Sequence, residues 1–236
     1  MTIENIALGE LEWAFFPQAM SKKPVTVPLQ DGTATVDGIA YTLGDPVYAD
    51  ADGDGDLDAA APLSALDGNG FDEQWYIWLD TGDGSAQQVL WPVARTERCG
   101  DVTRRVEGVD DGFRIKEARY GLDDQTAGTA CADLPIDRRT RTVSIVTEGP
   151  NGEAWPAQTK PIPSFGGICQ TSSSFDAYGG MGPLRLAPSA DSPVVTERDA
   201  VFDTQDWPIY ERFGTWHLVG FVTPDHHFGC GWFDRG

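Results

Sequence analysis

The feature that most constrains the fold of this chain is a succession of short β-like segments separated by Gly, Asp, Asn and Pro. These residues favour turns, and a spacing of roughly ten residues between turns is typical of sheet-rich proteins. Helical periodicity is scarce, and only residues 2–13 are expected to form a short amphipathic helix. The sequence therefore predicts a mainly β protein, with an α+β fold as the alternative. The expected strands cover residues 25–29, 39–43, 47–49, 57–63, 75–79, 89–93, 113–117 and 140–147.

The chain of 236 residues is long enough for one large domain or two modest ones. Its composition changes after Thr147, because residues 148–165 contain four prolines. Proline cannot donate a backbone hydrogen bond to a sheet and stiffens the chain, so this segment is expected to be a linker. The expected domains are a β-rich domain of residues 1–147 and a small β-barrel-like module of residues 166–236. The alternative is one domain in which residues 148–165 form a long surface loop.

The charge of the chain excludes some partners. There are 37 acidic and 17 basic residues, which give a formal net charge of −20. Nucleic-acid binding requires a cluster of basic side chains, so no nucleic-acid partner is expected, and binding to anionic lipid is disfavoured for the same reason. Residues 1–94 hold 16 of the acidic residues and two of the basic ones. The acidity is thus concentrated in the first part of the chain, which suggests that this part binds a cation.

The most informative motif is VYADADGDGDLDAAAPL at residues 47–63, which follows the pattern D-x-D-x-D-G-x-x-D. Carboxylates at alternating positions converge only if the chain curls tightly, and Gly53 and Gly55 permit the positive φ angles of such a curl. Clustered carboxylates repel one another unless a cation neutralises them, and Ca²⁺ accepts about six to eight oxygen ligands. A solvated acidic turn without an ion is the alternative. The expected calcium ligands are the side chains of Asp50, Asp52, Asp54 and Asp58 and the carbonyl group of Asp56.

The flanks of this loop differ from those of an EF-hand, which places a bidentate Glu at the twelfth loop position. Counted from Asp50, that position is Ala61, and both flanks are strand-like. Residues 45–93, including the run QWYIWLDTGDGSAQQVLWPV, resemble the calcium hairpin of FG-GAP and VCBS repeats, in which one strand enters the loop and another leaves it. The chain holds one copy, so a full propeller is not expected. A single hairpin of this kind also resembles certain actinobacterial cell-envelope lipoproteins, and it implies a structural calcium ion.

Four cysteines indicate disulfide bonds. Their even number, wide spacing and lack of a C-x-x-C pair favour disulfides over a zinc site, with four buried free thiols as the alternative. Four cysteines allow three pairings. The nearest-neighbour pairing keeps each bridge within one expected domain, and it joins Cys99 to Cys131 and Cys169 to Cys230.

Sequence signals for membrane insertion and export bear on the expected cellular location. No run approaches the roughly 18 apolar residues of a membrane helix, so no membrane span is expected. The first twenty residues lack the basic start, apolar block and cleavage site of a signal peptide. A cytosolic protein and the mature form of an exported one both fit, and the cysteines favour export. The expected location is outside the cytoplasm, secreted or in the cell envelope, and a native precursor could carry a lipid anchor.

Residues 181–236 resemble bacterial Src-homology-3-like domains. Segments at 184–188, 193–195, 216–222 and 231–233 follow the strand order of that family, although its Ser-Gly-Pro turn is absent and the stretch 199–213 is longer than the simple pattern. The resemblance implies a groove that binds a peptide or a cell-wall component. For Trp216 and Trp232, burial in the core is the favoured interpretation. The expected groove residues are Trp207, Tyr210, Trp216 and Trp232.

These patterns predict a secreted or cell-envelope, non-enzymatic calcium-binding protein. Its partner would be a cell-wall component or an envelope protein. Neither a nucleophile elbow nor a phosphate-binding loop occurs in the sequence. The alternative is a secreted hydrolase of cell-wall polymers that uses a pair of carboxylates, since the distance between two such groups is invisible in a sequence.

Overall fold

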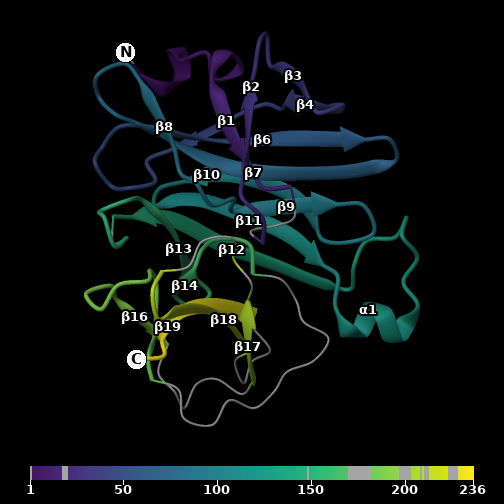
Figure 1. Ribbon diagram of the computed structural model, residues 1–236, viewed down its shortest axis with the longest axis vertical. Helices are drawn as coiled ribbons and strands as arrows, with labels where there is room; N and C mark the ends of the chain where they lie inside the picture. Colours follow the sequence, from purple (N-terminus) through teal and green to yellow (C-terminus); the bar gives the residue numbers. More distant parts are fainter. Residues whose placement is uncertain are drawn as a thin grey trace.

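The protein is built from antiparallel β-sheets arranged in three layers (Figure 1). Nearly all the regular structure in the described part of the chain is β-strand, together with one short α-helix and two 3-10 turns. The prediction of a mainly β fold is therefore confirmed. The computed structural model describes residues 2–17, 21–147, 149–169, 182–196, 203–207, 209, 213–222 and 228–236.

The first sheet is formed by the acidic first part of the chain. Its strand order is β3-β4-β6-β7-β8, with β5 paired to β6 and β9 paired to β7. The first half of β6 carries three consecutive alanines, Ala59 to Ala61, that are fully buried, because neighbouring layers cover both faces of the sheet there. The strands of this sheet are β3 (Thr33–Val36), β4 (Ile39–Leu43), β5 (Val47–Ala49), β6 (Asp58–Asp67), β7 (Gly70–Asp80), β8 (Ala86–Gln88) and β9 (Ala94–Glu97).

The strand expected at residues 89–93 is wrong. These residues connect β8 to β9, and both of those strands pair with β7. The N–H groups of Val89 and Val93 still donate to carbonyl groups of β7. Pro92 has no N–H to donate, so the residues between these two hydrogen bonds leave the sheet.

The helix expected at residues 2–13 is also wrong. This segment forms two 3-10 turns, η1 (Ile3–Asn5) and η2 (Leu8–Glu10), and then enters β1 (Glu12–Phe15), which pairs with β2 (Val25–Pro28). The carbonyl groups of Gly9 and Leu11 accept hydrogen bonds from Gly32 and Leu29. Pairing with distant segments therefore uses backbone groups that a helix would need for itself.

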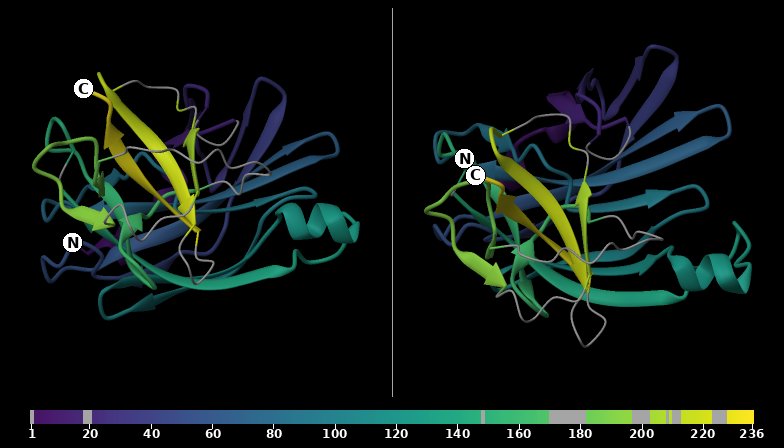
Figure 2. Two further views of the ribbon diagram at one scale, coloured as in Figure 1. Left: turned by 90° about the horizontal axis from the view of Figure 1, so that it is seen from below. Right: turned by 60° about the horizontal axis from the view of Figure 1, so that its bottom comes forward.

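The second sheet lies below the first and has the strand order β10-β11-β12-β13-β14. The short helix α1 (Leu122–Ala127) stands at one end of it (Figure 2). Asp124 holds the start of this helix, because its carboxylate accepts hydrogen bonds from the N–H groups of Gly121 and Ile136. No helix among the described residues is long and apolar enough to cross a membrane. The strands are β10 (Val102–Val109), β11 (Gly112–Arg119), β12 (Asp137–Val146), β13 (Trp155–Lys160) and β14 (Ser164–Phe165).

The prediction that residues 148–165 form a linker is wrong, because β13 and β14 lie within this segment. β13 pairs with β12 along one edge and with β14 along the other. Trp155 and Phe165 are fully buried. Two prolines fall in the turn between the strands, and Pro156 of β13 takes part through its carbonyl group, which accepts a hydrogen bond from Gly166. The burial of Trp155 and Phe165 therefore outweighs the expectation drawn from the proline content of the segment.

The third sheet has the strand order β16-β15-β19-β18-β17 and lies across the second sheet (Figure 2). The segments expected at 216–222 and 231–233 fall in β18 and β19. The strand β17 was not among the expected segments. The strands are β15 (Leu184–Arg185), β16 (Val194–Thr196), β17 (Asp203–Trp207), β18 (Trp216–Val222) and β19 (Phe228–Asp234).

One apolar core continues across the three layers. It joins Ile3 and Trp13 near the start of the chain to Trp232 in the last strand. Trp155 lies in its middle, stacked on Trp91 with ring centroids 5.6 Å apart and in edge contact with Trp232 at 5.3 Å. The residues on either side of the expected linker therefore pack on a common core rather than on two separate ones.

Candidate functional site

The acidic loop closes a β-hairpin. β5 and β6 pair in antiparallel fashion up to Ala49 and Asp58, so the loop consists of residues 50–57. Gly53 and Gly55 have φ angles of 80° and 98°, the left-handed region that favours glycine. Their N–H groups donate to the two carboxylate oxygens of Asp50, at 2.7 and 3.1 Å. The loop therefore curls around the first aspartate, as its sequence predicts.

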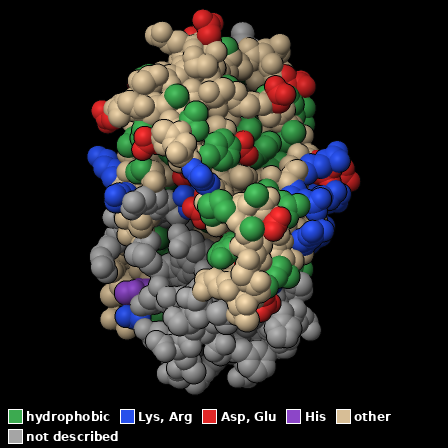
Figure 3. Space-filling model, turned by 90° about the vertical axis from the view of Figure 1, so that its right-hand side faces the viewer, with side chains coloured by type: hydrophobic (Ala, Val, Ile, Leu, Met, Phe, Trp, Pro, Cys, Tyr) green, Lys and Arg blue, Asp and Glu red, His purple; other side chains and the backbone are tan. Residues whose placement is uncertain are grey.

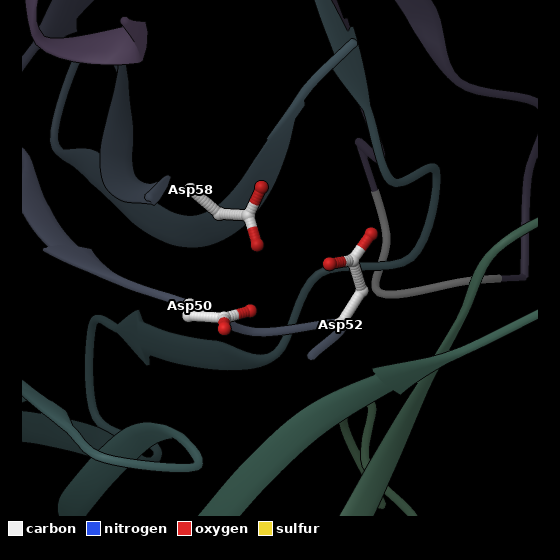
Figure 4. Close-up of side chains that lie close together, drawn as sticks. All are labelled: Asp50, Asp52 and Asp58. Carbon is white, nitrogen blue, oxygen red and sulfur yellow. The ribbon is translucent and has the colours of Figure 1, made fainter. Parts of the chain in front are cut away.

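Three carboxylates converge inside this curl. Oxygen atoms of Asp50, Asp52 and Asp58 all lie within 4.8 Å of one another, and the side chains point toward a common centre (Figure 4). Asp54, another expected ligand, is not in this group, and its carboxylate accepts a hydrogen bond from the N–H of Asp56 at 2.8 Å. Asp56 is exposed, and its expected contribution was the backbone carbonyl group alone. Three of the four expected side-chain ligands are thus brought together.

Asp58 differs from the other aspartates because it is buried, with 1% of its surface exposed. Its two carboxylate oxygens accept hydrogen bonds from the N–H groups of Ala51 at 2.8 Å and of Asp80 at 3.0 Å. Burial raises the pKa of Asp58 to about 6 despite these hydrogen bonds, and the charges of Asp52 and Asp54 add to the rise. Burial is also the main reason that the pKa of Asp52 is raised. A cation between these groups would favour their ionised forms.

The loop is anchored to the second sheet through Ala51, which is 3% exposed. While its N–H donates to Asp58, its carbonyl group accepts a 2.7 Å hydrogen bond from Ile145 in β12. Nearby, β10 approaches the hairpin so closely that a Cβ atom on Gly108 would lie 2.0 Å from the carbonyl oxygen of Tyr48. The base of the loop is therefore fixed by two sheets, whereas its tip is solvent-exposed.

The four cysteines form two disulfide bonds, Cys99–Cys131 and Cys169–Cys230. The prediction of disulfides and the nearest-neighbour pairing are confirmed. The first bridge joins the turn after β9 to the segment after α1, and the second joins the segment after β14 to β19. Disulfides form and persist in oxidising compartments, so the protein fits an extracytoplasmic environment.

Thiol titration checks this pairing. The denatured but unreduced protein is expected to show no free thiol, because all four cysteines are paired. After reduction, the same assay should detect all four. Reactive thiols before reduction would contradict both the pairing and the oxidising compartment that it implies.

Trp232 does not line the expected aromatic groove, and its interpretation as a core residue is confirmed. This residue is fully buried and packs edge-on against Trp155, Phe165 and Phe213, so it belongs to the core. Trp216 is half-buried and packs on the same core. The backbone of Trp207 lies in β17, but its side chain lies outside what the structure describes, as does the whole of Tyr210.

A polar pocket of about 320 Å³ lies beside α1. Its lining includes Arg95 and Glu97 of β9, Cys99 and Asp101 in the following turn, Tyr120, and Gln125 of α1. The face that carries α1 shows Lys and Arg side chains in a band across its middle (Figure 3). The sequence did not indicate this pocket, because no motif or regular spacing connects these residues.

Ion pairs shape the walls of the pocket. Arg95 pairs with Asp72 at 2.8 Å and with Glu97 at 3.0 Å. Burial raises the pKa of Glu97 and that of Asp101, although Arg95 and Arg119 respectively oppose the rise. Deeper inside, Arg141 pairs with Glu117 at 3.0 Å. Burial alone would raise the pKa of Glu117, but the charges of Arg141 and Arg119 outweigh it and lower the pKa.

Comparison with known proteins identifies no relative. No model of a known family matches the chain, and neither a curated protein nor a solved structure shows significant similarity to it. The resemblances to FG-GAP and VCBS repeats and to Src-homology-3-like domains therefore rest on the residues that carry them.

Proposed function

We propose that this chain is an extracytoplasmic, calcium-binding protein whose calcium ion stabilises the β5–β6 hairpin. The observation that carries the proposal is the convergence of the Asp50, Asp52 and Asp58 carboxylates inside a loop that is closed by two glycines. Carboxylate oxygens are the ligands of hard cations, and Ca²⁺ tolerates the irregular geometry of a short loop. Mg²⁺ demands tight octahedral geometry and gives up its waters reluctantly, so it is the poorer match.

The ion has a structural role in this proposal. The loop is anchored through Ala51 and Asp58, and a cation at its centre would offset the repulsion between the carboxylates and so stabilise the turn. The two disulfides support a secreted or cell-envelope location. The partner in this proposal is a cell-wall component or another envelope protein, and the native precursor could carry a lipid anchor.

Calcium titration tests the proposal. Extracellular calcium modules bind with Kd values on the order of 10⁻⁴–10⁻³ M. Binding only to the folded state at ten times Kd adds about 1.4 kcal/mol, which corresponds to a rise in Tm of about 3–6 °C for a chain of this size. Calorimetric titration and thermal unfolding of the metal-free protein should show one site and this shift, and Mg²⁺ should produce much less.

Single substitutions distinguish a loss of calcium binding from a loss of folding stability. Asp52→Asn should abolish the calcium-dependent shift without much loss of stability, because Asp52 is exposed and its carboxylate accepts a hydrogen bond from Asp54 within the loop. Asp83→Asn is the matched control, since Asp83 is an exposed aspartate in another hairpin turn and accepts hydrogen bonds from Thr81 and Ser85 of the same turn. No binding heat and no shift at saturating Ca²⁺ would leave only the solvated acidic turn.

A second candidate is the hydrolase with a carboxylate pair. The observation that favours it is the polar pocket, where Glu97 and Asp101 both have raised pKa values. Release of reducing ends from cell-wall glycan by the wild-type protein, lost in Glu97→Gln and in Asp101→Asn, would establish this activity. Absence of turnover would dismiss it and leave the calcium proposal unaffected.

A further inference from the structure

Arg119, at the end of β11, is a largely buried cation that lines a small recess. It is 6% exposed, and its guanidinium group donates no hydrogen bond to any residue that the structure describes. It forms an ion pair with Asp101, but the distance of 3.8 Å between Nε and Oδ2 is too long for a hydrogen bond. The ring of Phe228 lies 6.0 Å away. The nitrogen atoms of Arg119 are not among the enclosed, unpartnered polar atoms of the described residues, so its N–H groups open onto the adjoining space, where an external group can accept hydrogen bonds from them.

The space next to Arg119 fits one small polar group. A recess of about 10 Å³, close to the volume that admits a single water-sized group, is lined by Arg119, Asp101 and Glu117. It shares Arg95, Asp101 and Ile168 with the larger pocket of about 320 Å³, so the two spaces adjoin. A carboxylate or phosphate group is too large for this recess, whereas a hydroxyl group is not.

The charges around the two spaces balance. Three arginines face three carboxylates: Arg95, Arg119 and Arg141 against Glu97, Asp101 and Glu117. An anion would meet three carboxylates and a cation would meet three guanidinium groups, so neither gains a net attraction. A hydroxyl group both accepts and donates, and it can therefore satisfy Arg119 and Asp101 together. A pocket of this volume is at the small end of ligand sites, and Tyr120 adds an aromatic ring to its wall.

We propose that this pocket binds a neutral saccharide, with one sugar hydroxyl in the recess between Arg119 and Asp101 and the sugar ring in the adjoining pocket. The proposal is independent of the calcium site. The two sites lie at opposite ends of β7. At one end, Asp72 is opposite Glu97 of β9 in the sheet, beside the pocket, and at the other end the N–H of Asp80 donates to Asp58 at the acidic loop. The proposal concerns binding alone, so it does not depend on whether the protein cleaves a glycosidic bond.

Amide chemical-shift titration of the full-length protein tests the proposal. The probes are glucose, N-acetylglucosamine and cellobiose, with sodium acetate, sodium phosphate and ethanolammonium chloride as charged comparisons at matched ionic strength. The neutral sugars should give saturable shifts at the amides of Gly100, Asp101 and Tyr120, with millimolar Kd values. Arg119→Met should weaken this binding by about tenfold or more, because hydrogen bonds to a charged group are lost.

Two further variants keep the test decisive. Arg105→Met, which removes an exposed arginine of β10 paired with Glu107, should leave sugar binding unchanged. Glu97→Gln changes a partly exposed residue at the pocket, so it should fold and still weaken binding. Shifts at these amides caused by acetate or phosphate in place of sugars would overturn the proposal. Sugar binding that Arg119→Met and Glu97→Gln leave intact, or no shift with any sugar, would overturn it equally.

Discussion

Replacing Arg141 with leucine is expected to lower the free energy of unfolding by about 3–5 kcal/mol, because the substitution leaves a buried carboxylate without its partner. Arg141 is 8% exposed and connects three separate parts of the chain. Its guanidinium group pairs with Glu117 of β11 and donates to the carbonyl groups of Val93 and Gly166. These two carbonyl groups would also lose a donor in the variant.

Chemical denaturation of the variant and of a control measures this loss. Arg105→Leu is the matched control, since Arg105 is 65% exposed and its pairing with Glu107 lies at the surface. Its effect should stay within about 0.5 kcal/mol. Glu117→Leu combined with Arg141→Leu should recover part of the loss, because the unpaired charge is then absent. A loss for Arg141→Leu as small as that of Arg105→Leu would show that the buried pair is unimportant for stability.

The same pair predicts a dependence of stability on pH. The pKa of Glu117 is lower in the folded protein than in the unfolded chain, so its ionisation stabilises the fold above the unfolded-state value of about 4.3. This stabilisation is lost as the pH falls through the lower, folded-state pKa. On acidification below about pH 4, the wild-type protein should therefore lose more stability than the Glu117→Leu/Arg141→Leu protein. Parallel curves of unfolding free energy against pH would contradict this.

Trp155→Ala is the second substitution with a large expected effect, a loss of about 3–5 kcal/mol. Trp155 is fully buried, stacks on Trp91 and contacts Trp232 edge-on. Its removal would leave a cavity where the layers of the protein meet, and the aromatic contacts would be lost as well. Trp216→Ala is the comparison, and it should cost less because Trp216 is only partly buried.

The shape of the unfolding transition tests how the layers are coupled. A shared core predicts that wild-type protein unfolds in one transition and that Trp155→Ala shifts the whole of it. Far-ultraviolet circular dichroism and tryptophan fluorescence should then give coincident curves. Two transitions, of which Trp155→Ala shifts only one, would instead support independent domains at residues 1–147 and 166–236.

The acidic loop shows what could be predicted from sequence. Its three converging carboxylates lie within nine residues, so the alternating aspartates and the two glycines determine the curl through local backbone geometry. Turn residues and short apolar runs likewise predicted the mainly β fold. The disulfide pairing was predicted by choosing the one of three pairings that keeps each bridge within one expected domain, and the observed bridges span 32 and 61 residues.

Other features depended on contacts between distant segments. Residues 148–165 have the composition of a linker, yet β12 offers an edge for β13, and the core accommodates Trp155. Residues 2–13 have a weak helical pattern, which pairing with β2 and with Gly32 overrides. Similarly, Asp58 differs from its neighbours because it is buried and because its carboxylate accepts a hydrogen bond from Asp80, which lies in another strand, β7.

Sequence alone thus determined the class of fold, the acidic hairpin and the expectation of disulfides, because these depend on turns and on residues close together in the chain or on simple counts. Only the tertiary structure decided that the layers share one core and that Arg119 and Asp101 face a common recess. The physical reason is that burial and charge pairing depend on which surfaces meet in three dimensions. The residues around the recess come from β9 and the turn after it, from β11, β12, β13 and β19, and from the segment after β14, and no local pattern in the chain relates them.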